Sequence, residues 1–524
     1  MKGVIFKCIF VVFLACVMTT PATAENVLRW ASQGDPLTYD PHSANESPTI
    51  GASTQVYEAL VNRNWKLEKE PSLAVSWEIV NPTTWEFKLR KGVTFHDGTP
   101  FTAEDVAFTV KRANGETSEF RNYIKSVVET KIIDDYTIQL ITSGPNPILA
   151  DQLTYVFIMS KKWCEEHGVT EATSFKDKQE TYAVRHANGT GPFMLQLREP
   201  DIRTILVKNP NWWGLKQNPH NIDKIIYTPI TNAATRVAAL LSGEVDFLLD
   251  PPLQDLGRIK ANPDLKVQQT AQIRTIFYGV DQGSAELRSS NIKGKNPFKD
   301  PRVRKAMHMA IDIDAIHKKV MRDMSIPANV ITPPGVHGYP KDLDAQRPPY
   351  DPEKAKALLA EAGYPDGFEV SLDCPNNRYN NDERICQATV GMLGKIGIKV
   401  NLVAQPKTLH FPKITGRKTD FYMLGWGVAT LDSHYVFTYL LDSEGPWNGT
   451  RYSNPRVDEL TRAMEVEMDL AKRDQMIREV WEIITDEQVY IPLHHQVIAW
   501  GMNKRLEMPM EPNDQPQFRW ARLK

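Results

Sequence analysis

Short apolar runs alternate with capped helix patterns along almost the whole chain. Asp300, Asp351 and Asn454 each stand directly before a proline and an apolar helical stripe, which is typical of a helix start. Strands interleaved with helices predict an α/β fold. The runs that we interpret as strands cover residues 225–227, 247–249, 368–372, 398–403 and 490–493.

The chain is long enough to require more than one core. Its 524 residues predict two or more domains, and the absence of a low-complexity linker or repeat indicates lobes joined by ordered chain. Hydrophobic residues make up 41% and charged residues 24%, the balance of an ordinary globular protein. A net charge of −2 favours no polyanion, so we expect no nucleic acid partner.

The N-terminus has the three parts of a cleavable secretory signal. Lys2 and Lys7 supply a positive start, an apolar run extends from Cys8 to Met18, and small residues lead to Ala24. The apolar run is too short to span a bilayer. We therefore expect residues 1–24 to be removed and the mature chain to lie in the periplasm.

Three cysteines remain after this cleavage: Cys164, Cys374 and Cys386. The last two lie close together in sequence and are destined for an oxidising compartment, so we predict a disulfide between them, with two buried thiols as the alternative. Closing so short a loop would stabilise the fold by about 3 kcal/mol. The spacing fits no zinc motif.

The chain lacks the local motifs of common catalytic sites. It has no phosphate-binding Gly-x4-Gly-Lys-Ser/Thr loop, no His-Glu-x-x-His helix and no Gly-x-Ser-x-Gly turn. His494 and His495 are adjacent on a predicted strand, so we expect one to be buried and the other exposed, and no metal site. We expect no enzyme and no cofactor. A secreted two-lobed hydrolase remains an alternative, because catalytic groups need not be adjacent in sequence.

Trp426 lies where a ligand is expected. It follows the apolar run at residues 421–424, which reads as a buried strand, and it stands at the carboxyl end of that strand. In open α/β sheets, ligands bind beyond the carboxyl ends of the strands. An aromatic side chain there is suited to gripping a solute.

Six segments, in order along the chain, carry a family resemblance. They are LRKGVTFHDGTPFTAEDV (89–106), GTGPF (189–193), KNPNWW (208–213), ALLSGEVD (239–246), DPRVRKA (300–306) and YDPEKA (350–355). With them the chain resembles family 5 of the bacterial extracellular solute-binding proteins, which includes the dipeptide-, oligopeptide- and nickel-binding receptors of ABC importers.

The resemblance implies a two-lobed periplasmic-binding-protein (Venus flytrap) fold with an extra domain in the first lobe. A peptide-like solute would bind between the lobes and favour a closed form that docks on the ABC transporter permease at the inner membrane. We expect a monomer. The implied boundaries are 25–270 plus 494–524 for lobe I, about 55–190 for its extra subdomain, 272–491 for lobe II, and crossings near 273–277 and 489–492.

The resemblance also implies residues that contact the solute. Trp426 is kept, but the acid that pairs with the ligand's amino group in peptide-binding relatives is replaced by Ala429. Asp432 matches another acidic position of the same loop and is the candidate to take over that role. Arg378, directly before Tyr379, occupies the place of an arginine that binds the ligand carboxylate, for which a guanidinium fork is well shaped.

Other solutes remain open. His434 and His410 lie near the Trp426 loop, and a metal-chelate receptor would need a histidine there. A sugar derivative, an opine or another amino-acid conjugate is a further possibility within the same class. A chaperone-like role, holding unfolded segments, would be compatible with transport.

Overall fold

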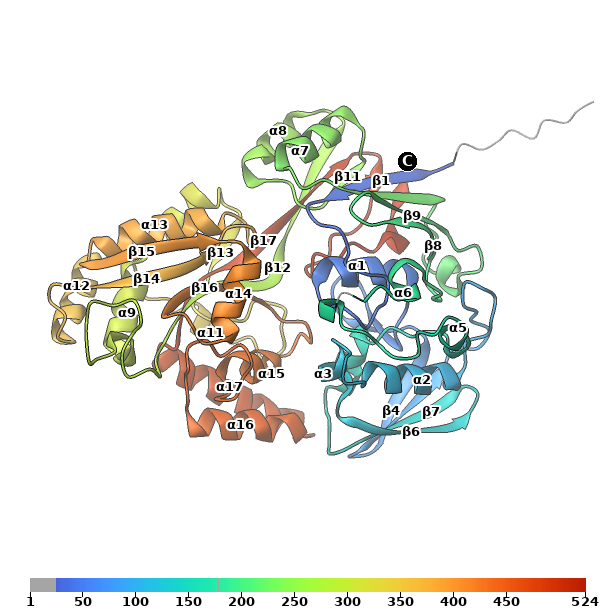
Figure 1. Ribbon diagram of the computed structural model, residues 1–524, viewed down its shortest axis with the longest axis horizontal. Coiled ribbons are helices and arrows are strands. Elements are labelled where there is room, and N and C mark those ends of the chain that lie inside the picture. The colour runs from blue at the N-terminus through green and yellow to red at the C-terminus, as the bar shows by residue number, and fades with distance from the viewer. Residues whose placement is uncertain (1–24, 178) are drawn as a thin grey trace, which may run out of the picture.

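Two long strands join the two lobes of the molecule. The computed structural model describes residues 25–524 apart from Lys178, so the predicted signal peptide lies outside the described residues. β12 (Leu265–Val280) and β17 (Tyr490–Asn503) pair antiparallel in the middle of an eleven-stranded sheet. They run from the upper part of the molecule into the lobe on the left of Figure 1, so both lobes share one sheet.

Lobe I holds the strands on one side of β17. Their order is β11-β1-β10-β9-β8, with β1 parallel to both β10 and β11. The chain returns to this lobe along β17, where Trp500 of β17 and Phe518 of the C-terminal segment join the same core as Leu28 of β1. The elements are β1 (Val27–Ser32), α1 (Ser47–Val56), β8 (Phe193–Glu199), β9 (Arg203–Lys208), β10 (Lys224–Pro229), α7 (Ala233–Ser242), β11 (Phe247–Leu248), α8 (Leu256–Ala261), β18 (Leu506–Glu507) and β19 (Arg522–Leu523).

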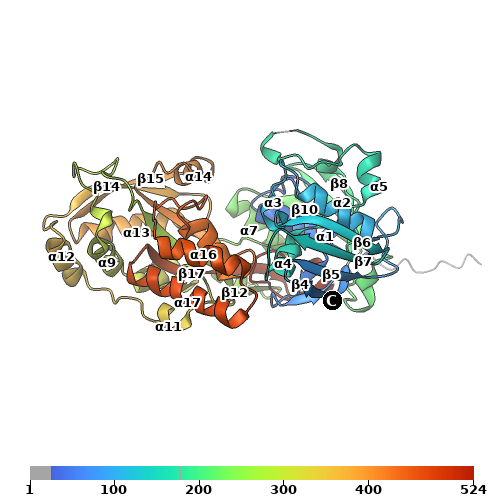
Figure 2. The same cartoon turned by 90° about the horizontal axis from the view of Figure 1, so that it is seen from below.

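A separate antiparallel sheet extends lobe I and lies below its main strands in Figure 1. Its order is β4-β5-β7-β6, and Figure 2 shows these strands at the outer end of the lobe. Thr102 and Asp105 form a capping box at the start of α2. The elements are β2 (Val61–Arg63), β3 (Lys69–Pro71), β4 (Ala74–Asn81), β5 (Thr84–Leu89), α2 (Ala103–Ala113), α3 (Arg121–Ile124), β6 (Val127–Asp134), β7 (Thr137–Thr142), α4 (Leu149–Gln152), α5 (Lys161–Glu166) and α6 (Tyr182–Arg185).

Lobe II is built on parallel strands covered by helices. β14 lies between β15 and β16 and runs parallel to both. The predicted helix caps are confirmed, since Asp300, Asp351 and Asn454 each accept a hydrogen bond from a backbone N–H of the first turn. The elements are α9 (Pro301–Ala310), α10 (Ile313–Ala315), β13 (Ser325–Pro327), α11 (Lys341–Asp344), α12 (Pro352–Glu361), β14 (Phe368–Pro375), α13 (Asp382–Gly394), β15 (Ile398–Gln405), α14 (Lys407–Thr415), β16 (Phe421–Gly427), α15 (Ser433–Val436), α16 (Pro455–Val466) and α17 (Leu470–Asp486).

The pairing of β12 with β17 is interrupted where the strands pass between the lobes. The register shifts between Ala271 and Thr275. The expectation that one of His494 and His495 is exposed is wrong, because both are buried. Their side chains occupy opposite faces of a strand that is covered on both sides. His495 Nε2 bonds the Asp344 carboxylate at 3.0 Å.

The predicted disulfide between Cys374 and Cys386 is confirmed. Cys374 lies in β14 and Cys386 in α13, so the bond closes the loop between the carboxyl end of that strand and the helix that follows. The remaining thiol, Cys164, is buried in lobe I.

Candidate functional site

Trp426 stands at the centre of an aromatic cluster in lobe II. It is the penultimate residue of β16, and its ring centroid lies 5.6–5.7 Å from those of Tyr435, Tyr439 and Trp447. Only 8% of the residue is exposed, and its indole Nε1 has no hydrogen-bond partner among the described residues. A buried indole N–H normally finds an acceptor, so a ligand group is a natural partner for this one.

Arg378 and Tyr379 lie in the loop that the disulfide closes. The Asp382 carboxylate accepts hydrogen bonds from the backbone N–H groups of both residues, which fixes the loop ahead of α13. The Tyr379 hydroxyl donates to the carbonyl of Gly425 at 3.2 Å, tying the loop to β16. The predicted residues Arg378, Tyr379 and Trp426 are therefore held by neighbouring parallel strands that end at the same edge.

A second arginine, Arg274, reaches this edge from β12. Its guanidinium carbon lies 5.9 Å from the centre of the Tyr379 ring, and that of Arg378 lies 5.2 Å from the same ring. Arg274 donates to the Gly425 carbonyl at 3.3 Å. Neither guanidinium has a carboxylate partner in the part of the chain that the structure describes.

The two arginines are electrostatically unbalanced. Burial, followed by the positive charge of Arg378, lowers the pKa of Arg274 to about 10. Both side chains nevertheless keep part of their surface open to solvent. Two half-buried cations without an anionic partner form a site to which a carboxylate would bind favourably.

Lobe I contributes two aspartates, Asp250 and Asp514. Burial raises the pKa of both carboxyls. The negative charge of Asp250 raises the pKa of Asp514 further, while the positive charge of Arg378 acts to lower that of Asp250. Asp514 accepts a hydrogen bond of 2.8 Å from the Trp500 indole, and Asp250 accepts one of 3.2 Å from the backbone of Gln33. Like the arginines, both are only half-buried.

The loop after Trp426 contacts lobe I. Ala429 packs against the lobe I core, and the carbonyl of Thr430 accepts a hydrogen bond of 3.2 Å from Arg63. Leu67 of lobe I in turn belongs to a core cluster that is otherwise formed by lobe II. Ala429 therefore lies at the contact between the lobes, with no charge to offer a ligand.

Asp432 is already paired inside lobe II. Both of its carboxylate oxygens accept hydrogen bonds of 2.7 Å from Arg473, and Oδ2 also lies 2.9 Å from the His337 ring. The carboxylate caps α15 as well, through the backbone N–H of His434. Hydrogen bonds from His337 and Arg473 outweigh burial and hold the pKa of Asp432 well below its usual range. A carboxylate with so many internal partners has little capacity left for a solute.

The two histidines near this loop also face the interior. His434 Nε2 lies 3.1 Å from the carbonyl of Thr461, and His410 Nε2 lies 2.8 Å from that of Met423. Burial lowers the pKa of both rings. Among residues 25–524, Lys178 aside, no group of three or more His, Cys, Asp or Glu side chains is placed to hold a metal ion.

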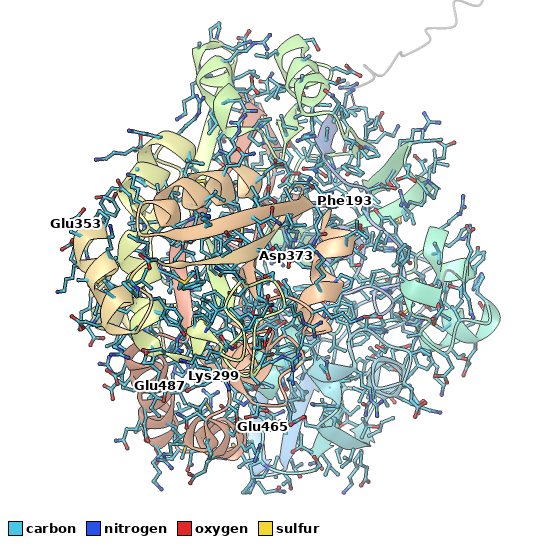
Figure 3. The ribbon with its side chains drawn as sticks, turned by 60° about the vertical axis from the view of Figure 1, so that its left-hand side comes forward. Phe193, Lys299, Glu353, Asp373, Glu465 and Glu487 are labelled. Carbon is cyan, nitrogen blue, oxygen red and sulfur yellow. A yellow bond between two sulfur atoms is a disulfide. The ribbon has the colours of Figure 1, made fainter. Side chains whose placement is uncertain are left out.

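Two surface pockets of lobe II lie elsewhere. One is lined by residues that include Lys299 and Glu487, which Figure 3 labels close together on this lobe. The other lies beside His337 and Arg478. Trp426, Arg378 and Tyr379 line neither pocket, so both are separate from the predicted site.

Sequence reasoning missed Arg274, Asp250 and Asp514. Asp250 could have been found, because it follows the short strand β11 and thus lies at a carboxyl end. Arg274 lies within the segment that the resemblance marks as a crossing, where its charge stands among apolar neighbours. Nothing in the sequence around Asp514 indicates its position.

Comparison with known proteins identifies the family. The profile of the bacterial extracellular solute-binding proteins, family 5 Middle, matches residues 68–448. The glutathione-binding protein GsiB of Salmonella choleraesuis is 26% identical over 500 residues, which cover 93% of this chain and 92% of that protein.

Solved structures share the fold over nearly the full length. The periplasmic binding protein DppA from Helicobacter pylori, in complex with the peptide STSA, superposes with a TM-score of 0.78 and 24% identity, covering 95% of this chain and 98% of that one. A dipeptide-binding protein from a Pseudoalteromonas species, in complex with Met-Leu, gives a TM-score of 0.78 and 23% identity, covering 95% and 100%. The two-lobed periplasmic-binding-protein fold is thereby confirmed.

Proposed function

This chain belongs to family 5 of the bacterial extracellular solute-binding proteins, and from that premise we propose that it captures a peptide or peptide-like solute between its lobes. It is a receptor and not an enzyme. The proposal extends to delivery of the solute to the permease of an ATP-driven importer.

The observation that carries the proposal is the pair of unpartnered guanidiniums, Arg274 and Arg378. A carboxylate placed against them would gain charge-assisted hydrogen bonds and relieve their mutual repulsion. Trp426 of the adjoining strand β16 carries a buried indole N–H without a partner among the described residues, which is a further donor at this end of the sheet. Relatives whose names and structures record glutathione, a tetrapeptide or Met-Leu as ligand have in common a solute with a carboxylate.

Closure of the lobes would follow from this arrangement. We propose that β12 and β17 bend where their register shifts, between Ala271 and Thr275, which makes this point the boundary between lobe I and lobe II. Arg274 lies inside that segment, so a solute bound to it acts directly on the hinge. A solute that contacts both lobes shifts the hinge equilibrium towards the closed form.

The proposed location is the periplasm, after removal of residues 1–24. The proposed partner is a permease at the inner membrane, on which the protein docks as a monomer. Within the described residues, no helix combines the length and the apolar character needed to cross a bilayer.

The test begins with identification of the solute. Native mass spectrometry of the mature protein, purified gently from the periplasm and also after mixing with a peptide digest, should reveal an added mass that is lost on denaturation. Fragmentation of that mass identifies the solute, and titration calorimetry then measures its affinity.

Arg378→Ala should weaken the affinity for that solute by at least about tenfold, because a charge-assisted hydrogen bond contributes about 1.5–3 kcal/mol. Arg288→Ala is the matched control, since Arg288 is exposed on lobe II. An unchanged affinity in Arg378→Ala would contradict the carboxylate role of this residue. The absence of any solute in either preparation would contradict the proposed function itself.

A further inference from the structure

The residues that the family resemblance assigns to the site include a partner for a carboxylate but none for an amino group. The position that carries an acid in peptide-binding relatives is Ala429, and Asp432 is bound by Arg473 and His337. An ammonium group that leaves water without an anionic partner loses several kcal/mol of solvation, on the order of the cost of any unpaired buried charge. A zwitterionic solute therefore needs another acidic site.

Asp250 and Asp514 have the properties that such a site requires. Neither carboxylate forms an ion pair closer than 4 Å with a cationic side chain of the described residues, although buried carboxylates are normally paired. Burial is the main cause of the raised pKa of each, and their mutual repulsion adds to it for Asp514. A cation between them would remove both penalties.

Their position relative to the arginines matches a zwitterion. The segment that carries Asp514 lies against β12 beside Arg274, because the backbone N–H of Ile273 donates to the Pro512 carbonyl at 3.0 Å. The strand β11, which leads to Asp250, packs close by, since the ring of Phe247 lies 5.3 Å from that of Trp500, whose indole donates to Asp514. The charge of Arg378 acts to lower the pKa of Asp250 and that of Arg274 the pKa of Asp514, yet no salt bridge joins either pair in the described chain. The aspartates belong to lobe I, at the end of β11 and in the C-terminal segment, whereas Arg378 belongs to lobe II. The opposite charges thus belong to elements on the two sides of the lobe junction, and no ion pair joins them among the described residues.

We propose, resting on the solute-binding function above, that Asp250 and Asp514 bind the ammonium group of the solute while Arg274 and Arg378 bind its carboxylate. The solute is then a zwitterion with a free amino group. Its two charges pair with the aspartates and the arginines, which form no salt bridges with one another among the described residues. The buried indole N–H of Trp426 is the independent sign of a ligand at the same edge. The free α-amino and α-carboxylate groups can come from one amino-acid head, as in a γ-linked peptide, or from the two termini of a short α-peptide.

The test uses two defined pools, each before and after N-acetylation. One pool holds glutathione and other amino-acid conjugates with an intact head group, and the other is an enzymatic digest rich in di- and tripeptides. Native mass spectrometry identifies which members bind the full mature protein. Binding from the first pool assigns the head group, and binding from the second assigns the peptide termini. Acetylation of the bound member should weaken its affinity by at least about tenfold.

Variants of the protein provide the second arm. Asp250→Asn and Asp514→Asn should each weaken the best-bound member by at least about tenfold, whereas Asp366→Asn, an exposed acid on lobe II, should leave its affinity unchanged. Asp514 also accepts the Trp500 hydrogen bond, so thermal melting checks that its variant is folded. Asp250→Asn and the acetylated pools test the proposal without that risk.

The outcomes separate this inference from the proposed function. Binding of solutes that lack an amino group, or affinity that is insensitive both to acetylation and to Asp250→Asn, would overturn the ammonium site while leaving a solute receptor. If the wild-type protein binds no member of either pool and carries no solute from the periplasm, the proposed function fails and this inference fails with it.

Discussion

Two clusters of charged side chains lie close to the Trp426 loop, and they differ in how they are paired. Around Asp432, charged side chains pair with one another: Arg473 donates to both carboxylate oxygens, and His337 bridges Asp432 and Asp474. Around Tyr379, Arg274 and Arg378 have no ion-pair partner among the described residues. The first arrangement stabilises the fold, and the second leaves two cations without an anionic partner, as the proposed binding of a carboxylate requires.

The difference explains why charge alone does not identify a binding residue. Asp432 and Arg378 are both polar residues at the carboxyl ends of lobe II strands, yet only the latter has free hydrogen-bonding capacity. A charged side chain whose hydrogen bonds are already made within the protein gains little free energy from a solute, whereas one without a partner gains the energy of the new hydrogen bonds. The comparison therefore rests on pairing, and the following variants test it.

Replacing Arg473 should produce the largest effect. Arg473→Met leaves the Asp432 carboxylate buried with only His337 as a charged partner, which should lower the free energy of unfolding by about 3–5 kcal/mol. The matched variant Arg274→Met removes a cation that has no ion-pair partner, so it should change that free energy little or raise it. Urea unfolding of both variants measures the contrast. An equal loss in the two variants would contradict the distinction between the clusters.

Breaking the disulfide should have an intermediate effect, and it should lower both the free energy of unfolding and the affinity for the solute. Reduction of Cys374–Cys386 releases the loop that carries Arg378 and should lower the free energy of unfolding by about 3 kcal/mol in the chain-entropy model. Solute affinity should fall as well, because Arg378 loses its fixed position. Unfolding and calorimetry with and without dithiothreitol measure both. The double variant with Ser at both positions should not respond to the reductant.

His337 should give the smallest effect, visible as a pH dependence. The hydrogen bond that the His337 ring donates to Asp432, together with the charges of Asp432 and Asp474, raises the pKa of His337 against the opposing effects of burial and Arg473. Its contribution to stability is thus complete below the unfolded pKa of about 6.5 and is lost as the pH rises through the folded value. The side chain is 44% exposed, so the contribution should stay below about 1 kcal/mol.

His337→Gln should remove this dependence. The difference in unfolding free energy between wild type and variant, measured at about pH 5.5 and about pH 8.5, should be larger at the lower pH. A difference that grows with pH would contradict the direction of the shift.

Local patterns in the sequence determined most of the fold. The helix caps at Asp300, Asp351 and Asn454 and the strand that contains Trp426 depend on neighbouring residues, and each appears in the structure as predicted. The disulfide belongs here too, because twelve residues and an oxidising compartment are enough to suggest it. The family segments added the two-lobed architecture.

Only the tertiary structure decided which charges are free. Asp432 pairs with Arg473, which is 41 residues away in the sequence, and no local sequence pattern predicts this pairing. Arg274, Asp250 and Asp514 come from separate parts of the chain. β12 and β11 flank the same strand, β17, and the C-terminal segment is tied to β12 by the hydrogen bond from Ile273 to the Pro512 carbonyl. Sequence periodicity records which side of an element is buried, but the pairing of charges depends on distances between elements, and those are set by packing.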